Sequence, residues 1–301
     1  MLFWSRRRRE SRWDYFTVIE NNLSGEVFDP TLTTLFPSTV AWISSDGYAV
    51  VTTGTTHDVS YTVPADGPRI WNIFCSSGLD YIRTFDMNTD KVVHIDVSLL
   101  RAVTSMNAHT NASLVMALTD LPVGLTIASF STDSLLTGDI STLPVGLTAA
   151  YFYSDPLLTG DISTLPVGLT AASFDSDPLL TAGSVSSLTV ISDLRLDSIG
   201  WNSASVDTVL LSISNAIHAN VNHFTYATPS LLIGGTNAAP GGTPEAATTS
   251  PLTTPGSGNS DTDWQWDAGA GKHKALTGMA AIWIMRNNTG HAWTVTATGV
   301  A

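Results

Sequence analysis

Hydrophobic positions recur every 22 residues between Gly124 and Val190, and this period is the strongest pattern in the chain. Copies begin at Gly124, Gly146 and Gly168, and the first two copies are identical at 17 of 22 positions. The third copy departs from the pattern after Thr181. A fixed period of this length predicts a solenoid, in which each unit buries its apolar side against its neighbours.

Each copy also predicts one short strand. The first copy carries apolar or small residues at Leu125, Ala128 and Phe130, and such alternation is typical of a strand with one buried face. Weaker copies of the same pattern begin near Ile82, Val103 and Ile191. We therefore expect about six strands in a solenoid that covers residues 81–199.

The repeat resembles that of leucine-rich repeat proteins. Its first half follows the pattern L-x-x-L-x-L-x-x-N-x-L, and its second half, Leu-Thr-Gly-Asp-Ile-Ser-Thr-Leu, is similar to the variant L-T-G-x-I-P-x-x-L. The resemblance covers residues 82 to 199 and implies a curved solenoid whose strand face recognises a partner. Where the pattern has Asn, the three best copies have Asp133, Asp155 and Asp177. In that pattern the Asn side chains form a ladder of hydrogen bonds inside the solenoid. An ionised Asp accepts hydrogen bonds but donates none, so we expect at most half of the hydrogen bonds of this ladder to be present.

Stacking would place Asp133, Asp155 and Asp177 in one column, about 4.8 Å apart. Bare carboxylates at that spacing would repel each other by roughly 3 kcal/mol at an effective dielectric constant of about 20. We expect loop N–H groups to absorb this charge, and a bridging calcium ion is the alternative. No other cofactor is expected, because the seven His residues lack metal-site spacing and Cys75 is the single cysteine.

Residues 15–80 read as an all-β domain, because short β-branched and aromatic runs alternate with turn signals such as Asp46-Gly47. Short strands at close spacing predict a β-sandwich. The order Trp42, Asp46-Gly47, His57 and Tyr61 also resembles a PKD-like domain, whose pattern is W-x-x-G-D-G followed by H-x-Y. Such a domain would cover the apolar edge of the first repeat.

Residues 200–301 predict a small cap with the order helix, strand, helix, strand. The first helix is expected to start from an N-cap at Ser203 or Ser205, and the second to cover residues 272–286. This order resembles the C-terminal cap of leucine-rich repeat proteins encoded by bacteriophages and by bacteria. A Pro/Gly/Thr-rich insertion at 236–263 reads as a flexible loop or arm. The pair Trp264 and Trp266 after it is expected to pack under the second helix, and an exposed binding surface is the alternative.

The expected fold class is mixed α/β, with an N-terminal β-sandwich, a short leucine-rich repeat solenoid and a small α/β C-terminal cap. A basic arm over residues 1–14 precedes them, and residues 13–301 carry a net charge of −17. We expect the arm to dock on the acidic body of a neighbouring copy, with a solvated tail and nucleic-acid binding as alternatives. The arginines of the arm are Arg6, Arg7, Arg8, Arg9 and Arg12.

The acidic balance argues against specific nucleic-acid binding and against anionic membranes as partners. The N-terminus lacks the apolar run of a secretory signal, and no stretch of 18 apolar residues predicts a membrane span. The G-x-S-x-G, H-E-x-x-H and P-loop motifs are missing from the sequence. We therefore do not expect an enzyme.

The outward positions of the predicted strands vary while the core positions hardly change. Two Tyr residues take the place of Ser on this face in the second good copy, and Tyr is enriched where an amphipathic contact is made. An ordinary solvated face with two stray Tyr residues is the alternative. The predicted binding residues are Tyr151, Tyr153, Asp175, Arg195 and Asp197.

These observations lead us to expect a structural and interaction protein of a virus particle, in the first place a bacteriophage virion. The expected partners are other virion or surface proteins, further copies of the chain, and a host glycan or host surface protein. The alternatives are a secreted or cell-surface leucine-rich repeat adhesin, extracellular in location, and a glycan-active enzyme. The cap resemblance, the lack of an export signal and the near-identical repeats motivate this expectation.

Overall fold

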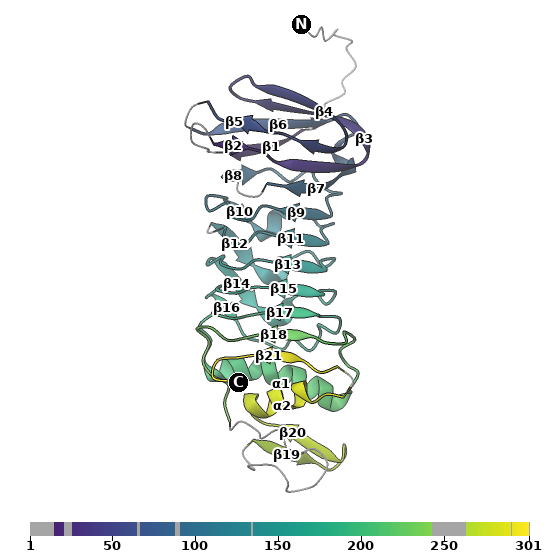
Figure 1. The fold of residues 1–301 in the computed structure, drawn as a ribbon, viewed down its shortest axis with the longest axis vertical. Coiled ribbons are helices and arrows are strands. Elements are labelled where there is room, and N and C mark those ends of the chain that lie inside the picture. The colour runs from purple at the N-terminus through teal and green to yellow at the C-terminus, as the bar shows by residue number, and fades with distance from the viewer. Residues whose placement is uncertain are drawn as a thin grey trace.

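The protein is an elongated stack of coils (Figure 1). Antiparallel strands lie at its N-terminal end and two helices lie near its other end. One main sheet of 13 strands runs along the stack, so the fold is mostly β and is built on a solenoid. The computed structural model describes residues 15–20, 26–64, 67–87, 91–133, 135–242, 263–289 and 291–300.

Parallel strands at 22-residue spacing form one side of the solenoid. Leu125, Leu147 and Leu169 are fully buried at equivalent positions, as the alternating pattern predicts. The strands expected in the repeats are confirmed, and two strands of the C-terminal segment extend the same sheet. In spatial order they are β7 (Ile82–Asp86), β9 (Ser105–Asn107), β11 (Ile127–Ser129), β13 (Ala149–Tyr151), β15 (Ala171–Ser173), β17 (Asp193–Arg195), β18 (Ser230–Leu232) and β21 (Thr294–Thr296).

Strands of two to four residues and 3₁₀ turns form the opposite side of the coils. Asp139 and Asp161 begin two of these turns, and each carboxylate accepts the N–H of the residue two positions later. Backbone N–H groups of the turns therefore satisfy the carboxylates of Asp139 and Asp161. The elements are β8 (Val92–Ile95), β10 (Met116–Ala117), β12 (Leu136–Asp139), β14 (Leu158–Asp161) and β16 (Leu180–Thr181), with η2 (Leu118–Asp120), η3 (Ile140–Thr142) and η4 (Ile162–Thr164). A further 3₁₀ turn, η1 (Leu79–Tyr81), leads directly into β7.

Stacked aromatic rings fill the interior between the two sides. The ring centroids of Phe130 and Phe152 are 5.8 Å apart, and those of Phe152 and Phe174 are 5.7 Å apart, with nearly parallel planes. Ala128 and Ala150 are buried beside them, so a small residue next to each Phe leaves room for the stack. Each coil thus buries its rings against those of its neighbours.

The N-terminal strands continue the main sheet, and the structure does not confirm a separate sandwich. Their order is β7-β3-β6-β1-β8, with β4 on the free side of β3. Because β7 and β8 belong to the first coil, this sheet passes over the end of the solenoid. Among the described residues, the β2–β5 pair lies against this sheet, where Phe28 stacks on Trp71 at 4.7 Å. The strands are β1 (Tyr15–Glu20), β2 (Val27–Phe28), β3 (Thr31–Ser44), β4 (Ala49–Asp58), β5 (Tyr61–Thr62) and β6 (Arg69–Cys75).

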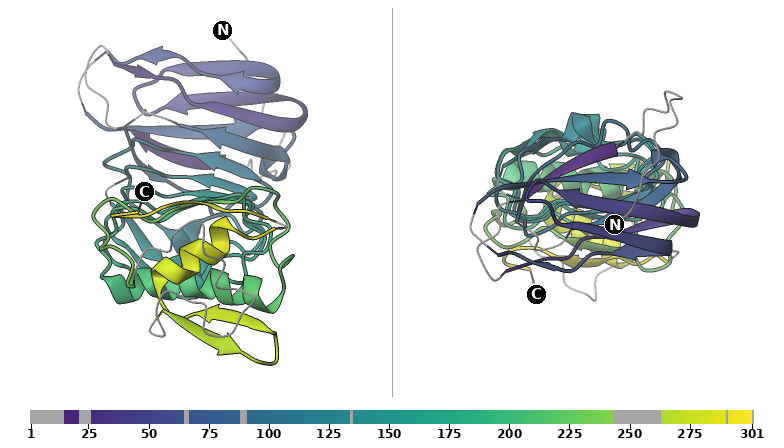
Figure 2. Two further views of the ribbon diagram at one scale, coloured as in Figure 1. Left: turned by 60° about the horizontal axis from the view of Figure 1, so that its bottom comes forward. Right: turned by 90° about the horizontal axis from the view of Figure 1, so that it is seen from above.

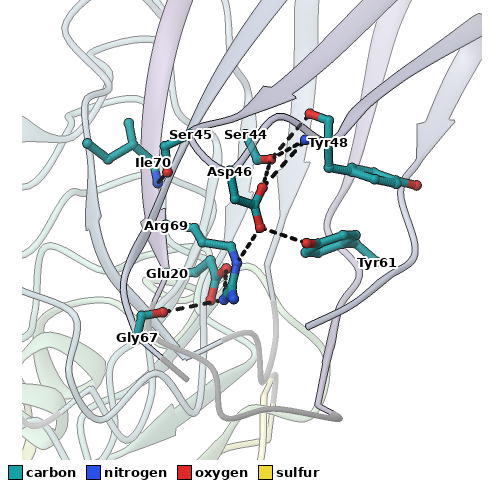
Figure 3. A network of polar contacts seen from close by, with 9 residues as sticks. All are labelled: Glu20, Ser44, Ser45, Asp46, Tyr48, Tyr61, Gly67, Arg69 and Ile70. Carbon is teal, nitrogen blue, oxygen red and sulfur yellow. Dashed lines mark hydrogen bonds and ion pairs between the residues drawn. The ribbon is translucent and has the colours of Figure 1, made fainter. Parts of the chain in front are cut away.

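A polar network fastens the β3–β4 turn to β5 and β6 (Figure 3). Asp46 accepts hydrogen bonds from Ser44, from the Tyr61 hydroxyl at 2.8 Å and from Arg69 Nε at 2.9 Å. Arg69 also pairs with Glu20, which is fully buried, at 3.5 Å. The Ser44 hydrogen bond, together with those from Tyr61 and Arg69, lowers the pKa of Asp46 although burial opposes the shift. These contacts show that Asp46-Gly47, the turn signal noted in the sequence, has a structural role in the β3–β4 turn.

The C-terminal segment has both expected strands and two helices, α1 (Ser203–Ala219) and α2 (Gly278–Arg286). The N-cap of α1 is Asn202, whose side chain accepts the N–H of Ser205, so the prediction of a Ser cap was wrong by one to three residues. Residues 272–275 were predicted to begin the second helix, but they lie outside α2. They form strand β20 (Lys272–Ala275), which pairs with β19 (Trp264–Asp267) in a hairpin.

Two local features explain the hairpin. Gly271 has a φ of 64°, a left-handed conformation that suits the turn, and β20 alternates buried with partly exposed residues. The hairpin places Trp264 against Trp283 of α2 at a centroid distance of 6.0 Å, which confirms that Trp264 packs under the second helix. Most of the predicted insertion, residues 243–262, lies outside the described residues.

Candidate binding face

The outward side of the parallel strands brings the predicted binding residues together. In register, Tyr151 of β13 lies beside Ser173 of β15, which lies beside Arg195 of β17. Asp175 and Asp197 follow two residues later in the same two coils, and the N–H of Asp197 donates to Asp175 Oδ1 at 3.3 Å. Neighbouring coils therefore form one continuous surface from residues far apart in the sequence.

The two Tyr residues flank Phe152 but point away from the core. Phe152 is fully buried, whereas Tyr153 is 40% exposed and Tyr151 is half-buried. Successive strand residues face opposite sides of a sheet, so Tyr151, the last residue of β13, faces outward next to buried Ala150. Tyr153 lies in the turn after the strand, and its exposure places it on the surface. They are not needed to fill the interior, so they are free to contact a partner.

Asp175 is the most perturbed acid on this face. It accepts the hydroxyl of Ser173 at 2.9 Å as well as the N–H of Asp197. Burial, a hydrogen bond with the Asp197 carboxyl and the charge of Asp197 raise the pKa of Asp175 to about 6. The pair can therefore hold a proton near neutral pH and offer a donor and acceptors side by side.

Arg195 also belongs to the polar part of this face. Its guanidinium is paired with Asp193, a residue that was not predicted from the sequence. Its Nε donates to Asp193 at 2.9 Å, and the Ser230 hydroxyl donates to the same carboxylate at 2.5 Å. Asp193 stands two residues before Arg195 on one strand, so the alternation of strand residues could have placed both on one side. Ser230 comes from β18, whose register the repeats did not predict.

Asp133, Asp155 and Asp177 lie inside the coils and not on the binding face. All three are fully buried, and one oxygen of each accepts an N–H from the preceding coil at 2.7 Å. This confirms that loop N–H groups engage the column. Burial raises the pKa of Asp133 and Asp177 to about 8 and that of Asp155 to about 9. In the described part of the chain, no three His, Cys, Asp or Glu side chains are grouped to hold a metal ion.

Other expectations fall outside this face. The arm arginines Arg6 to Arg12 precede Tyr15 and lie outside the described residues. Neither α1 nor α2, the helices that the structure describes, is long and apolar enough to cross a membrane, in line with the prediction of no span.

No protein-family model, no curated protein and no solved structure matches this chain.

Proposed function

We propose that the protein is a structural and adhesion component of a virus particle, of the leucine-rich repeat type found in bacteriophages and bacteria. The solenoid serves as a spacer, and its strand face attaches the particle to a glycan or protein on the host surface. The single observation that carries the proposal is the cluster of Tyr151, Tyr153, Asp175, Asp197 and Arg195 on one exposed face.

The chemistry of this cluster suits a glycan. Sugars present apolar ring faces and many hydroxyl groups, which match exposed Tyr rings and paired carboxyl groups. The surface is open and polar, as in a reversible attachment site. A secreted or cell-surface adhesin would use the same face in the same way, so it remains the second candidate.

Cleavage of the glycan is less well supported than binding. A glycosidase needs two carboxyl groups about 5 to 9 Å apart around the scissile bond. Here Asp175 accepts the backbone N–H of Asp197 at 3.3 Å, so the two residues are in direct contact on the strand face. We therefore assign the pair to recognition.

Replacing Tyr151 and Tyr153 together by Ser should weaken glycan attachment at least tenfold and leave folding intact. The neighbouring coils already carry Ser129, Ser131 and Ser173 at equivalent positions, so Ser fits the strand. The test is binding of the labelled full chain to a printed array of bacterial surface polysaccharides.

The matched control is Tyr226→Ser, which removes a Tyr that is 48% exposed in the C-terminal segment. It should bind as the parent does. Equal binding by the double variant, or no binding by the parent to any polysaccharide on the array, would contradict a glycan site on this face.

A further inference from the structure

The outer face of the N-terminal sheet is apolar. Register pairs Val51 of β4 with Ala41 of β3, Ala41 with Phe74 of β6, and Phe74 with Tyr15 of β1, so one apolar row crosses four strands. The most exposed members of this face are Tyr15 at 47%, Ile43 at 40%, Val51 at 61% and Ile70 at 44%. We call this surface the tip face.

The tip face also lacks charge. Where the four strands lie side by side, over residues 15–19, 39–43, 49–53 and 70–74, their outward positions carry only apolar, Thr and Asn side chains, and the charged Asp58 lies beyond them at the far end of β4. These outward positions are Tyr15, Thr17, Ile19, Thr39, Ala41, Ile43, Ala49, Val51, Thr53, Ile70, Asn72 and Phe74. Residues 13–301 as a whole have a net charge of −17. An uncharged surface on so acidic a chain is a place where two copies can meet without repulsion.

The opposite face of the same sheet is already covered, by the first coil and by the β2–β5 pair. Phe16 contacts Phe85 of the first coil edge to face at 5.0 Å, and Trp71 stacks on Phe28 of β2 at 4.7 Å. Seen from above, the strands spread across the end of the stack, so the tip face points away from the coils (Figure 2). Strands covered on both faces read as nearly continuous apolar runs; Val40-Ala-Trp-Ile43 is such a run, and Ile70-Trp-Asn-Ile-Phe74 is interrupted by Asn72 alone.

We propose that the tip face binds the tip face of a second copy, so that two sheets pack face to face and two solenoids point in opposite directions. Two sheets can pack face to face about 10 Å apart, as they do in β-sandwiches. End-to-end contact also keeps the two acidic bodies far apart, whereas side-by-side contact would bring them together. The β-sandwich predicted from the sequence then forms between two chains.

The size of the face sets the expected strength. Four strands about 4.8 Å apart and about six residues long cover roughly 400 Å² of flat surface, below the roughly 800 Å² per partner of a standard interface. We therefore expect a reversible dimer with a dissociation constant on the order of micromolar. The inference does not rest on the proposed function, because the two surfaces share no residue.

Val51→Lys combined with Ile70→Lys should abolish the dimer. Lys at these exposed positions places like charges in the contact, and the fold should tolerate them because both side chains already reach solvent. The control combines Val123→Lys with Val145→Lys, which adds the same charge at 83% and 88% exposed positions of the repeats. Molar mass is measured by sedimentation velocity on the full chain from about 1 to about 100 micromolar, with thermal unfolding of each variant to show that it folds.

The parent and the control should pass from monomer to dimer as the protein concentration rises. The tip variant should stay monomeric up to concentrations at least tenfold above those at which the parent dimerises. A monomeric parent throughout, or a tip variant that dimerises like the parent, would overturn the proposal. A monomeric parent that floats with phosphatidylcholine vesicles, while the tip variant does not, would overturn it too and assign the face to a lipid surface. Glycan attachment by the tip variant should be unchanged, which separates this outcome from a failure of the strand-face site.

Discussion

The free energy of unfolding should fall as pH rises from about 4 to about 9, and replacing Asp133, Asp155 and Asp177 by Asn should remove most of that fall. In the folded chain the pKa of Asp133 and Asp177 is about 8 and that of Asp155 about 9, against an ordinary value of 3.8. A group that holds its proton only when folded stabilises the protein fully below its unfolded pKa. That stability is lost as pH rises towards the folded pKa, by up to about 1.4 kcal/mol per pH unit and group.

The geometry explains why the neutral acid is the form that fits. Asn111 occupies the same column one coil earlier, and its Nδ2 donates to the carbonyl oxygens of Ala108 and Met87 at 2.5 and 2.9 Å. Asn237 donates in the same manner at the C-terminal end of the column, to Leu196 and Ile233. In each Asp, the oxygen that would replace this nitrogen has no hydrogen-bond partner. A protonated carboxyl could donate from that oxygen, as the Asn amide does, whereas a carboxylate cannot.

Urea unfolding of the parent and of the triple Asn variant at pH 5, 7 and 9 measures this effect. The variant should gain several kcal/mol over the parent at pH 9 and much less at pH 5, because the buried charge is removed at all three sites. The control replaces Asp139 and Asp161 by Asn in the same coils, where the carboxylates are turn caps at the surface. A triple variant with the same pH dependence as the parent would mean that the column is ionised in the folded protein.

Phe152→Ala should cost about 3 to 5 kcal/mol of unfolding free energy, because it opens a cavity in the middle of the ring stack. Both neighbours, Phe130 and Phe174, lose a contact at once. In a solenoid each coil is held mainly by the coils beside it, so a gap in the central repeat uncouples the two ends.

The matched control is Tyr153→Ala on the next residue, which faces solvent. It should cost about 1 kcal/mol or less. Chemical unfolding followed by far-ultraviolet circular dichroism compares the two variants. If both lose the same stability, the Phe column is not the core of the stack.

The repeats could be predicted from the sequence because the same pattern occurs in three good copies. Leu125, Leu147 and Leu169 carry the same local signal at equal spacing, and each copy supports the assignment of the others. The internal position of Asp133 followed from the same alignment. Its raised pKa did not, because burial depends on how closely the neighbouring coils pack.

The two ends were harder to predict because they occur once. The run from Lys272 to Arg286 satisfies a helical pattern over its length, and only the pairing with Trp264 to Asp267 shows that its first residues form a strand. At the N-terminal end, short strands at close spacing predicted a sandwich. The first coil and the β2–β5 pair cover one face of the sheet, and Ile43 and Ile70 on the other face are exposed.

The proposed function rests on the chain being part of an assembled particle. Immunogold electron microscopy of particles purified from the source, with an antibody against the repeats, tests this most directly. We predict gold label on particles at a fixed place on their surface, with the same chain found in the particles by mass spectrometry. Label confined to soluble material, with the chain absent from purified particles, would contradict it.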